Sequence, residues 1–287
     1  MEVMITDPSQ GVWRTPGESS VRRPLDCPFP WPCAPCSSET CLAFGCLASH
    51  ECMVIQKNTG QLLCQMPCVP GVCGMALSRC GRYLYQLSSE ADCVHTRLTA
   101  TGELLYAVPT GVFPRSMVMN ASGQNLLVAG GAASEAYILT LPQLHKEAVV
   151  TTRHPCFAAG FFQKGLVLVC AVEGEDIHTA VYVLAWHSVR PRLLTQLPGQ
   201  PGGLCVCPDG RQALLSTRDG LKKLDLQTGD LLWNLPEWAL AMNLGCMGNL
   251  ALISGAMDGR VALISHYTPW MQRELACGTA TEACFCV

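Results

Sequence analysis

Glycine recurs along this chain of 287 residues at a nearly constant interval, and that interval limits the possible folds more than any other feature. Each glycine lies in a turn between two apolar runs. The intervals between successive glycines are 42, 42, 45 and 38 residues. A period near 40 residues is typical of chains built from repeated units of supersecondary structure. The stretches are SRCGRYLY (78–85), NASGQNLL (120–127), FQKGLVLV (162–169), CPDGRQAL (207–214) and GCMGNLAL (245–252), with turn glycines Gly81, Gly123, Gly165, Gly210 and Gly248.

A second turn lies between these glycines and divides each repeat further. It reads Thr-Gly, any residue and two leucines, and it occurs in NTGQLL (58–63), ATGELL (100–105) and QTGDLL (227–232). Each repeat therefore predicts four strands joined by short turns, with glycine where the turn requires a positive φ. Short Gly-containing links between alternating apolar runs are typical of antiparallel hairpins. Four antiparallel strands in a repeat of this length form one blade of a β-propeller.

The two chain ends predict how the ring closes. The N-terminal stretch MEVMITDPSQGVWRTPG resembles the last two strands of a blade, and the C-terminal stretch TATEACFCV resembles an innermost strand. Pairing of these strands would close the ring and remove a free sheet edge. A second strand is not recognisable there, so we expect three strands in this closing blade. Residues 16–30 are Pro-rich and polar and predict a connection between blades.

We therefore predict an all-β fold, a seven-bladed β-propeller closed by pairing of its N- and C-terminal strands, with a six-bladed ring as the alternative. It forms one domain over residues 1–287. The expected blades cover 31–70, 71–111, 112–154, 155–198, 199–238 and 239–278, with a composite blade made of 1–15 plus 279–287.

This turn pattern resembles a known family. The turn glycines, the Thr-Gly turns and the stretch STRDGLKKLDLQTG (216–229) are similar to the YVTN-repeat (YncE-like) propellers and to the lactonase-type propellers related to them. The resemblance implies a ring of seven blades. For the lactonase type it also implies opening of a sugar lactone at a divalent cation held by inner Glu, Asn and Asp residues. The matching positions here are Asn120, Asn243 and Glu282.

Two other propeller classes fit less well. WD40 propellers repeat Gly-His and Trp-Asp pairs, and neither pair occurs in this chain. A quinoprotein propeller needs Trp at the end of most blades. Trp233 follows one Thr-Gly turn, but Cys64 and Tyr106 hold the matching positions after the others. LDLQTGDLLW (224–233) is therefore interpreted as the third and fourth strands of one blade.

Composition narrows the class of partner. Hydrophobic residues make up 49% of the chain and charged residues 14%, against roughly 25% charged in an average domain. Most strands are therefore expected to be buried on both faces. The net charge of −3 favours neither nucleic acid nor an acidic membrane surface as a partner. The first residues lack the pattern of a signal peptide, and no apolar run approaches the roughly 18 residues of a membrane helix. We expect a cytoplasmic protein.

The chain contains 19 cysteines, which we expect to be mostly reduced, buried and used for packing. CAPC in the first blade and CFC in the closing blade lie on strands expected to be neighbours. However, C-x-C places both thiols on one face of a strand, while C-x-x-C places them on opposite faces. Cys205 and Cys207 repeat the C-x-C spacing with no evident partner pair, which favours packing. The alternative is a zinc site formed by Cys33, Cys36, Cys284 and Cys286.

Functional groups of a propeller come from the ends of the inner strands and the loops around the central channel. One equivalent position precedes each inner strand, at Trp31, Cys73, Arg115, Phe157, Gly202, Leu240 and Glu282. Arg115 and Glu282 are its charged members. The competing interpretation is a solvated rim, with Asn side chains that satisfy turn backbone groups. The candidate ligand-binding residues at the channel mouth are Trp31, Arg115, Asn120, Asn243 and Glu282.

No catalytic motif is present: G-x-S-x-G, H-E-x-x-H and the Gly-Lys pair of a P-loop are all missing. We therefore expect a non-catalytic scaffold or binding module that presents its loop face or channel to a protein or small ligand. It would use no cofactor and would bind neither nucleic acid nor membranes. The alternative is a lactonase-type hydrolase acting on a sugar lactone. Fold alone does not decide between them.

Overall fold

The structure is a computed structural model, and it describes most of the chain. The described residues are 2–7, 11–16, 23–25, 32–46, 49–241, 243–254, 259–265, 267, 271–276 and 282–286. They form strands almost throughout, with one short 3₁₀ helix, η1 (Pro236–Trp238). Among them, no helix has the length and apolar character needed to cross a membrane. The all-β prediction is confirmed.

The strands pair into seven antiparallel sheets of four, and six of these sheets are continuous in the chain. Each of the six runs in sequence order from the innermost to the outermost strand. They are β4 (Pro32–Ser37), β5 (Cys41–Cys46), β6 (Glu51–Gln56) and β7 (Leu62–Pro67); β8 (Val72–Leu77), β9 (Tyr83–Ser88), β10 (Cys93–Leu98) and β11 (Leu104–Pro109); β12 (Ser116–Met119), β13 (Asn125–Ala129), β14 (Glu135–Thr140) and β15 (His145–Thr151); β16 (Cys156–Phe162), β17 (Gly165–Val172), β18 (His178–Ala185) and β19 (Arg192–Pro198); β20 (Pro201–Val206), β21 (Gln212–Thr217), β22 (Gly220–Asp225) and β23 (Leu231–Leu235); and β24 (Asn243–Met247), β25 (Leu250–Ser254), β26 (Val261–Ser265) and β27 (Met271–Ala276).

The seventh sheet is composite, because it joins both chain ends. β28 (Glu282–Cys286) is its innermost strand and pairs antiparallel with β1 (Glu2–Asp7), which pairs with β2 (Gly11–Pro16). Closure by pairing of the ends is confirmed. The expectation of three strands was wrong, because β3 (Arg23–Leu25) adds a fourth at the outer edge. β1 and β2 are therefore the second and third strands, and part of the expected connection 16–30 is a strand.

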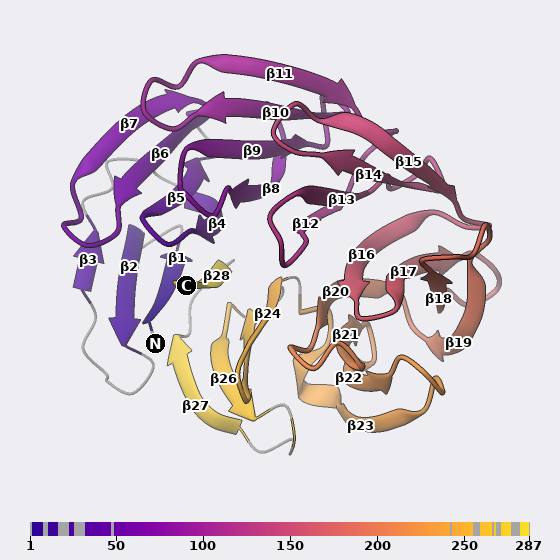
Figure 1. Cartoon of the computed structure of the whole chain (residues 1–287). Helices are drawn as coiled ribbons and strands as arrows, with labels where there is room; N and C mark the ends of the chain where they lie inside the picture. The colour runs from indigo at the N-terminus through magenta and orange to yellow at the C-terminus, as the bar shows by residue number, and fades with distance from the viewer. Residues whose placement is uncertain are drawn as a thin grey trace.

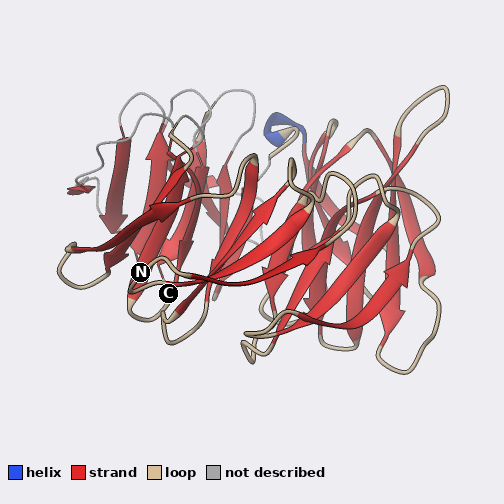
Figure 2. Ribbon diagram, turned by 90° about the horizontal axis from the view of Figure 1, so that it is seen from above, coloured by secondary structure: helices blue, strands red, loops and turns tan. Residues whose placement is uncertain are grey.

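The seven sheets are arranged in a closed ring (Figure 1). The innermost strands contact one another in the order β28, β4, β8, β12, β16, β20, β24 and back to β28. Seen from the side, the strands run from one face of a flat disc to the other, and the turns lie on the two faces (Figure 2). The starts of the inner strands therefore share one face, and their ends share the other.

The core consists of apolar layers between neighbouring sheets. The second strands are buried on both faces, as the run GLVLVCAV of β17 illustrates. Most residues of the outermost strands β7, β11 and β15 are exposed to solvent, including apolar residues such as Leu62 and Leu104. Burial of most strands on both faces explains why so few residues of this chain are charged.

Glycine is required at the turn between the first two strands of a sheet. Gly81 has a φ of +71° and Gly210 a φ of +62°. A Cβ atom at Gly210 would lie 3.0 Å from the Cβ of Gln163 in the preceding sheet. At Gly81 and Gly210 the left-handed turn therefore also packs against the preceding sheet.

Candidate functional site

A large cavity of about 1270 Å³ lies in the central channel. Its wall comes from four consecutive inner strands, β12, β16, β20 and β24, with the turns at their ends. Small residues are part of this wall, among them Ala159, Gly160, Gly202 and Gly203. The chain thus provides a pocket that is mostly backbone and apolar side chain, as ligand sites commonly are.

Arg115 lies at one mouth of this cavity, directly before β12, and its side chain is exposed. The guanidinium carbon is 5.4 Å from the centre of the Phe157 ring, a distance at which a cation interacts with the π face. Within the described part of the chain, this guanidinium makes no hydrogen bond and no ion pair. Its donors are therefore available to an anionic group.

A smaller cavity of about 230 Å³ adjoins the same mouth. Arg115, Phe157 and Gln200 line both cavities, so the guanidinium lies where the two spaces meet. Phe113 and Ile177, which are 57% and 44% exposed, form part of the outer rim. This face of the ring thus combines one cation with apolar side chains.

The other predicted mouth residues do not gather around Arg115. Asn243 begins β24 and lines the large cavity at the same end. Asn120 follows β12 at the opposite end, about 13 Å away for four residues of strand. Its Oδ1 accepts hydrogen bonds from the backbone N–H groups of Gln124 and Asn125, at 3.0 and 3.1 Å. Asn120 therefore stabilises its own turn, and its part in a ligand site stays a prediction.

Two further candidates cannot be placed. Trp31 lies outside the described residues. Glu282 begins β28, but its side chain lies outside the description. The cation site that the lactonase resemblance implies would need Asn120 beside Asn243, and the strand direction separates them. No group of three His, Cys, Asp or Glu residues that could bind a metal occurs in the described ranges.

The proposed zinc ligands divide between two core layers. Cys33 and Cys36 pack between the first two continuous sheets. Cys284 packs on the other side of β4–β7, against the layer around Met4 and Phe44. The side chain of Cys286 lies outside the description. A sheet therefore separates Cys33 and Cys36 from Cys284, so these three thiols do not gather in one layer.

A bulge explains why Cys33 and Cys36 share a layer although C-x-x-C predicts opposite faces. The pairing of β4 with β5 shifts register between these two residues, and Ala34 has a φ of +47°. An inserted residue rotates the strand, so the second thiol turns to the same side as the first. Sequence spacing alone could not show this irregularity.

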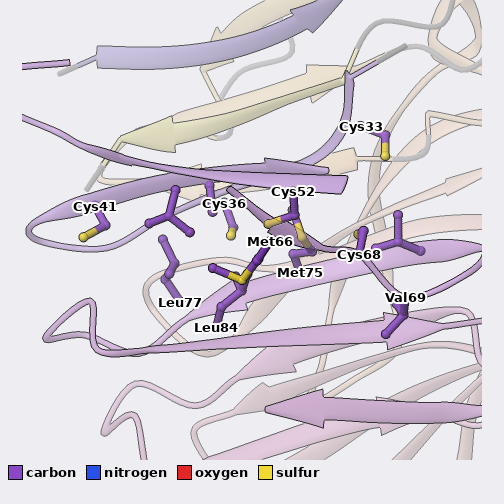
Figure 3. Packing of buried hydrophobic residues seen from close by; sticks show 13 residues of the cluster. Cys33, Cys36, Cys41, Cys52, Met66, Cys68, Val69, Met75, Leu77 and Leu84 are labelled. Carbon is purple, nitrogen blue, oxygen red and sulfur yellow. The ribbon is translucent and has the colours of Figure 1, made fainter. Parts of the chain in front are cut away.

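The layer that holds these thiols is the most cysteine-rich of the described core (Figure 3). Burial raises the pKa of Cys36, and the nearby Cys68 raises it further. Burial raises the pKa of Cys68 itself to about 12. These thiols stay protonated at neutral pH, as packing cysteines do. The cysteines of this layer are Cys33, Cys36, Cys41, Cys52 and Cys68, and Cys64 packs at the edge of the layer.

A different group of thiols does line the channel. Cys205 and Cys207 face the neighbouring inner strand β24, where Cys246 meets both through thiol hydrogen bonds. All three line the large cavity. The sequence showed no second pair of cysteines beside Cys205 and Cys207. It did not reveal Cys246 as their neighbour, because Cys246 belongs to the next repeat.

A closed ring of four-stranded sheets around a lined channel defines this protein as a β-propeller. No protein-family model matches the chain, and no curated protein sequence matches it. Solved structures whose names describe several different functions do resemble it.

Three of these structures illustrate the range. A protein from Lactobacillus plantarum has 11% identity and a TM-score of 0.77, with 99% of both chains covered. A Bacteroides uniformis protein provisionally named 6-phosphogluconolactonase has 13% identity and a TM-score of 0.74, again with 99% of both chains covered. The Swd1 propeller domain from Myceliophteria thermophila has 13% identity and a TM-score of 0.70, with 89% of this chain and 91% of that chain covered. At such identities the likeness shows the fold alone.

Proposed function

We propose that this protein is a non-catalytic propeller module that binds a small anionic molecule in its central channel. The observation that carries the proposal is Arg115, whose guanidinium lies at the junction of two cavities with a ring beneath it and no described hydrogen-bonding partner. A guanidinium binds carboxylates and phosphates through paired hydrogen bonds. Phe157 orients the planar group, and Asn243 and Gln200 offer amides in the wall of the large cavity. The turn glycines and Thr-Gly turns support a YVTN-type repeat for the same module.

The test measures binding of inorganic phosphate, gluconate and 6-phosphogluconate to the full chain by calorimetry. We expect at least one of these anions to bind and Arg115→Ala to weaken its binding about tenfold to a hundredfold, the value of a lost charge-assisted hydrogen bond. Arg115→Lys should restore part of the affinity. Arg218 provides the matched control, because it is an exposed arginine at the same ends of the strands but does not line the cavity.

The same protein and variants also test the lactonase alternative. Opening of 6-phosphogluconolactone would be followed by the acid it releases. Turnover above the spontaneous rate that is lost in Asn243→Ala would replace the binding-module proposal with an enzyme. Equal affinity of Arg115→Ala and Arg218→Ala for the anions would contradict the assigned site.

A further inference from the structure

The three channel thiols come together because of strand register. Cys205 and Cys207 are two residues apart at the end of β20, so their side chains share the face toward β24. Cys246 of β24 belongs to the same apolar layer as Cys207, next to Leu244. The Cys246 thiol makes hydrogen bonds with Cys205 and with Cys207. Cys205 and Cys246 are half-buried, whereas Cys207 is 2% exposed, and all three line the cavity.

A buried cation lies on the same face of the sheet. Cys205 pairs with Leu214 on β21, and Leu214 pairs with Lys223 on β22, so the three side chains point to one side. Lys223 is 2% exposed, and its ammonium lies 5.2 Å from the centre of the Tyr267 ring. A positive charge in this layer favours a thiolate over a thiol.

Two neighbouring groups, Cys246 and Lys223, lower the pKa of Cys207. The hydrogen bond from Cys246 lowers the pKa of the Cys207 thiol most, and the charge of Lys223 lowers it further. Burial and the carboxylate of Asp209 oppose this shift. The pKa of Cys246 is raised because its proton is held between the two acceptor sulfurs. Cys207 is thus the nucleophile of the pair and Cys246 the proton donor.

We propose that Cys207 and Cys246 form a peroxide-reactive dithiol in the wall of the central channel, with Lys223 as the positioning cation. A hydroperoxide that enters the cavity is attacked by the Cys207 sulfur, its O–O bond breaks, and water or an alcohol leaves once a proton is taken up. The product is a sulfenic acid on Cys207. Cys246 then attacks this sulfur, the S–O bond breaks, and water leaves. Two thiols are oxidised to one disulfide, and the peroxide is reduced.

This disulfide would join two neighbouring sheets at the channel wall. Cys207 and Cys246 pack in the same layer and line the same cavity, and a disulfide would bring their sulfurs to about 2.05 Å from each other. Because β20 and β24 are adjacent inner strands, the disulfide would lie within the cavity wall and would not cross the cavity. The site does not depend on anion binding at Arg115, so each proposal can fail alone.

The chain contains a matched internal comparison. Cys156 and Cys170 face each other on β16 and β17, and their thiols also share a hydrogen bond. Both are 0% exposed, and neither lines the cavity in the central channel. Both pairs therefore bring two buried or half-buried thiols together, and access to the channel differs.

The experiment treats the full chain with one equivalent of hydrogen peroxide and maps disulfides in unreduced peptides by mass spectrometry. We expect the Cys207–Cys246 link to form about tenfold faster than any Cys156–Cys170 link, because access and thiolate fraction both favour it. Exposed Cys80, whose pKa is lowered by a hydrogen bond from Ser78, serves as a check that peroxide reached the protein. Formation of the Cys156–Cys170 link at an equal rate would overturn the proposal.

Two variants assign the roles. In Cys246→Ser the sulfenic acid on Cys207 should persist and be captured by dimedone, because its resolving thiol is gone. Lys223→Met should slow the reaction about threefold to tenfold by reducing the thiolate fraction. A link through Cys205, or oxidation of Cys80 while Cys207 remains unmodified in the wild-type chain, would overturn the assignment without any variant.

Discussion

At Gly81 the turn between β8 and β9 meets the neighbouring sheet so closely that a side chain has no room. A Cβ atom there would overlap Thr40 and lie 2.9 Å from the sulfur of Cys41. Gly60 has nearly the same backbone, with a φ of +73° against +71° at Gly81, yet nothing lies within 4 Å of its Cβ position. The two positions separate the cost of a left-handed backbone from the cost of crowding.

We expect Gly60→Ala to lower the free energy of unfolding by about 1 kcal/mol, the cost of a left-handed alanine. Gly81→Ala should lower it by about 3 kcal/mol, because Thr40 and Cys41 must also move. Urea unfolding monitored by fluorescence measures both values. Equal losses would show that the contact with the neighbouring sheet costs nothing.

At the scale of the element, the sheet interface around Cys36 and Cys68 couples stability to pH. A thiol whose pKa is higher in the folded chain holds its proton more tightly there. Its contribution to stability is complete below the ordinary pKa of 9.0 and is lost as the pH rises toward about 12. Stability should therefore fall on the alkaline side.

Between pH 9 and pH 12 we expect each such thiol to lower the free energy of unfolding by about 1.4 kcal/mol for every pH unit. Cys68→Ala removes one of these thiols, so the free energy of unfolding should fall less steeply with pH, by the amount that one thiol contributes. Val69→Ala removes packing from the same layer but no titrating group, so its slope should match the wild type. Unfolding free energies at a series of pH values measure the slopes. An unchanged slope in Cys68→Ala would contradict the assignment.

Elements also show where sequence reasoning succeeds. The turn glycines and apolar alternation predicted the four-stranded repeats, since both are local properties of the chain. β3 was missed because Arg23, Pro24 and Leu25 show no alternation, and its pairing depends on β2. The partnership of Cys246 with Cys207 was missed because it depends on the register of two separate repeats. The bulge at Ala34 is likewise set by packing.

At the scale of the whole molecule, the ring depends on one strand that the C-terminus supplies. Phe285 of β28 packs between the composite sheet and β24–β27, with Val3 and Leu252 among its neighbours. Its ring reaches to 3.3 Å from the Cβ position of Gly245. Its carbonyl accepts a hydrogen bond of 2.7 Å from Ser37 on the opposite side. One residue thus contacts both neighbouring sheets.

Phe285→Ala should lower the free energy of unfolding by about 3–5 kcal/mol, the cost of a cavity in a filled layer. Phe113→Ala should change it by less than about 0.5 kcal/mol, because Phe113 is 57% exposed. Thermal unfolding of the two variants beside the wild type compares the effects. Similar losses in both would show that the closing strand contributes little to the stability of the ring.

The composite sheet also has a consequence for the growing polypeptide. β1 to β3 are synthesised before the six continuous sheets, whereas their innermost partner β28 is synthesised after them. Until then the inner edge of β1 has no partner, and an unpaired edge readily adds a foreign strand. During translation the hairpin of β1 and β2 must therefore wait for all six continuous sheets, and the ring can close only after β28 has been synthesised.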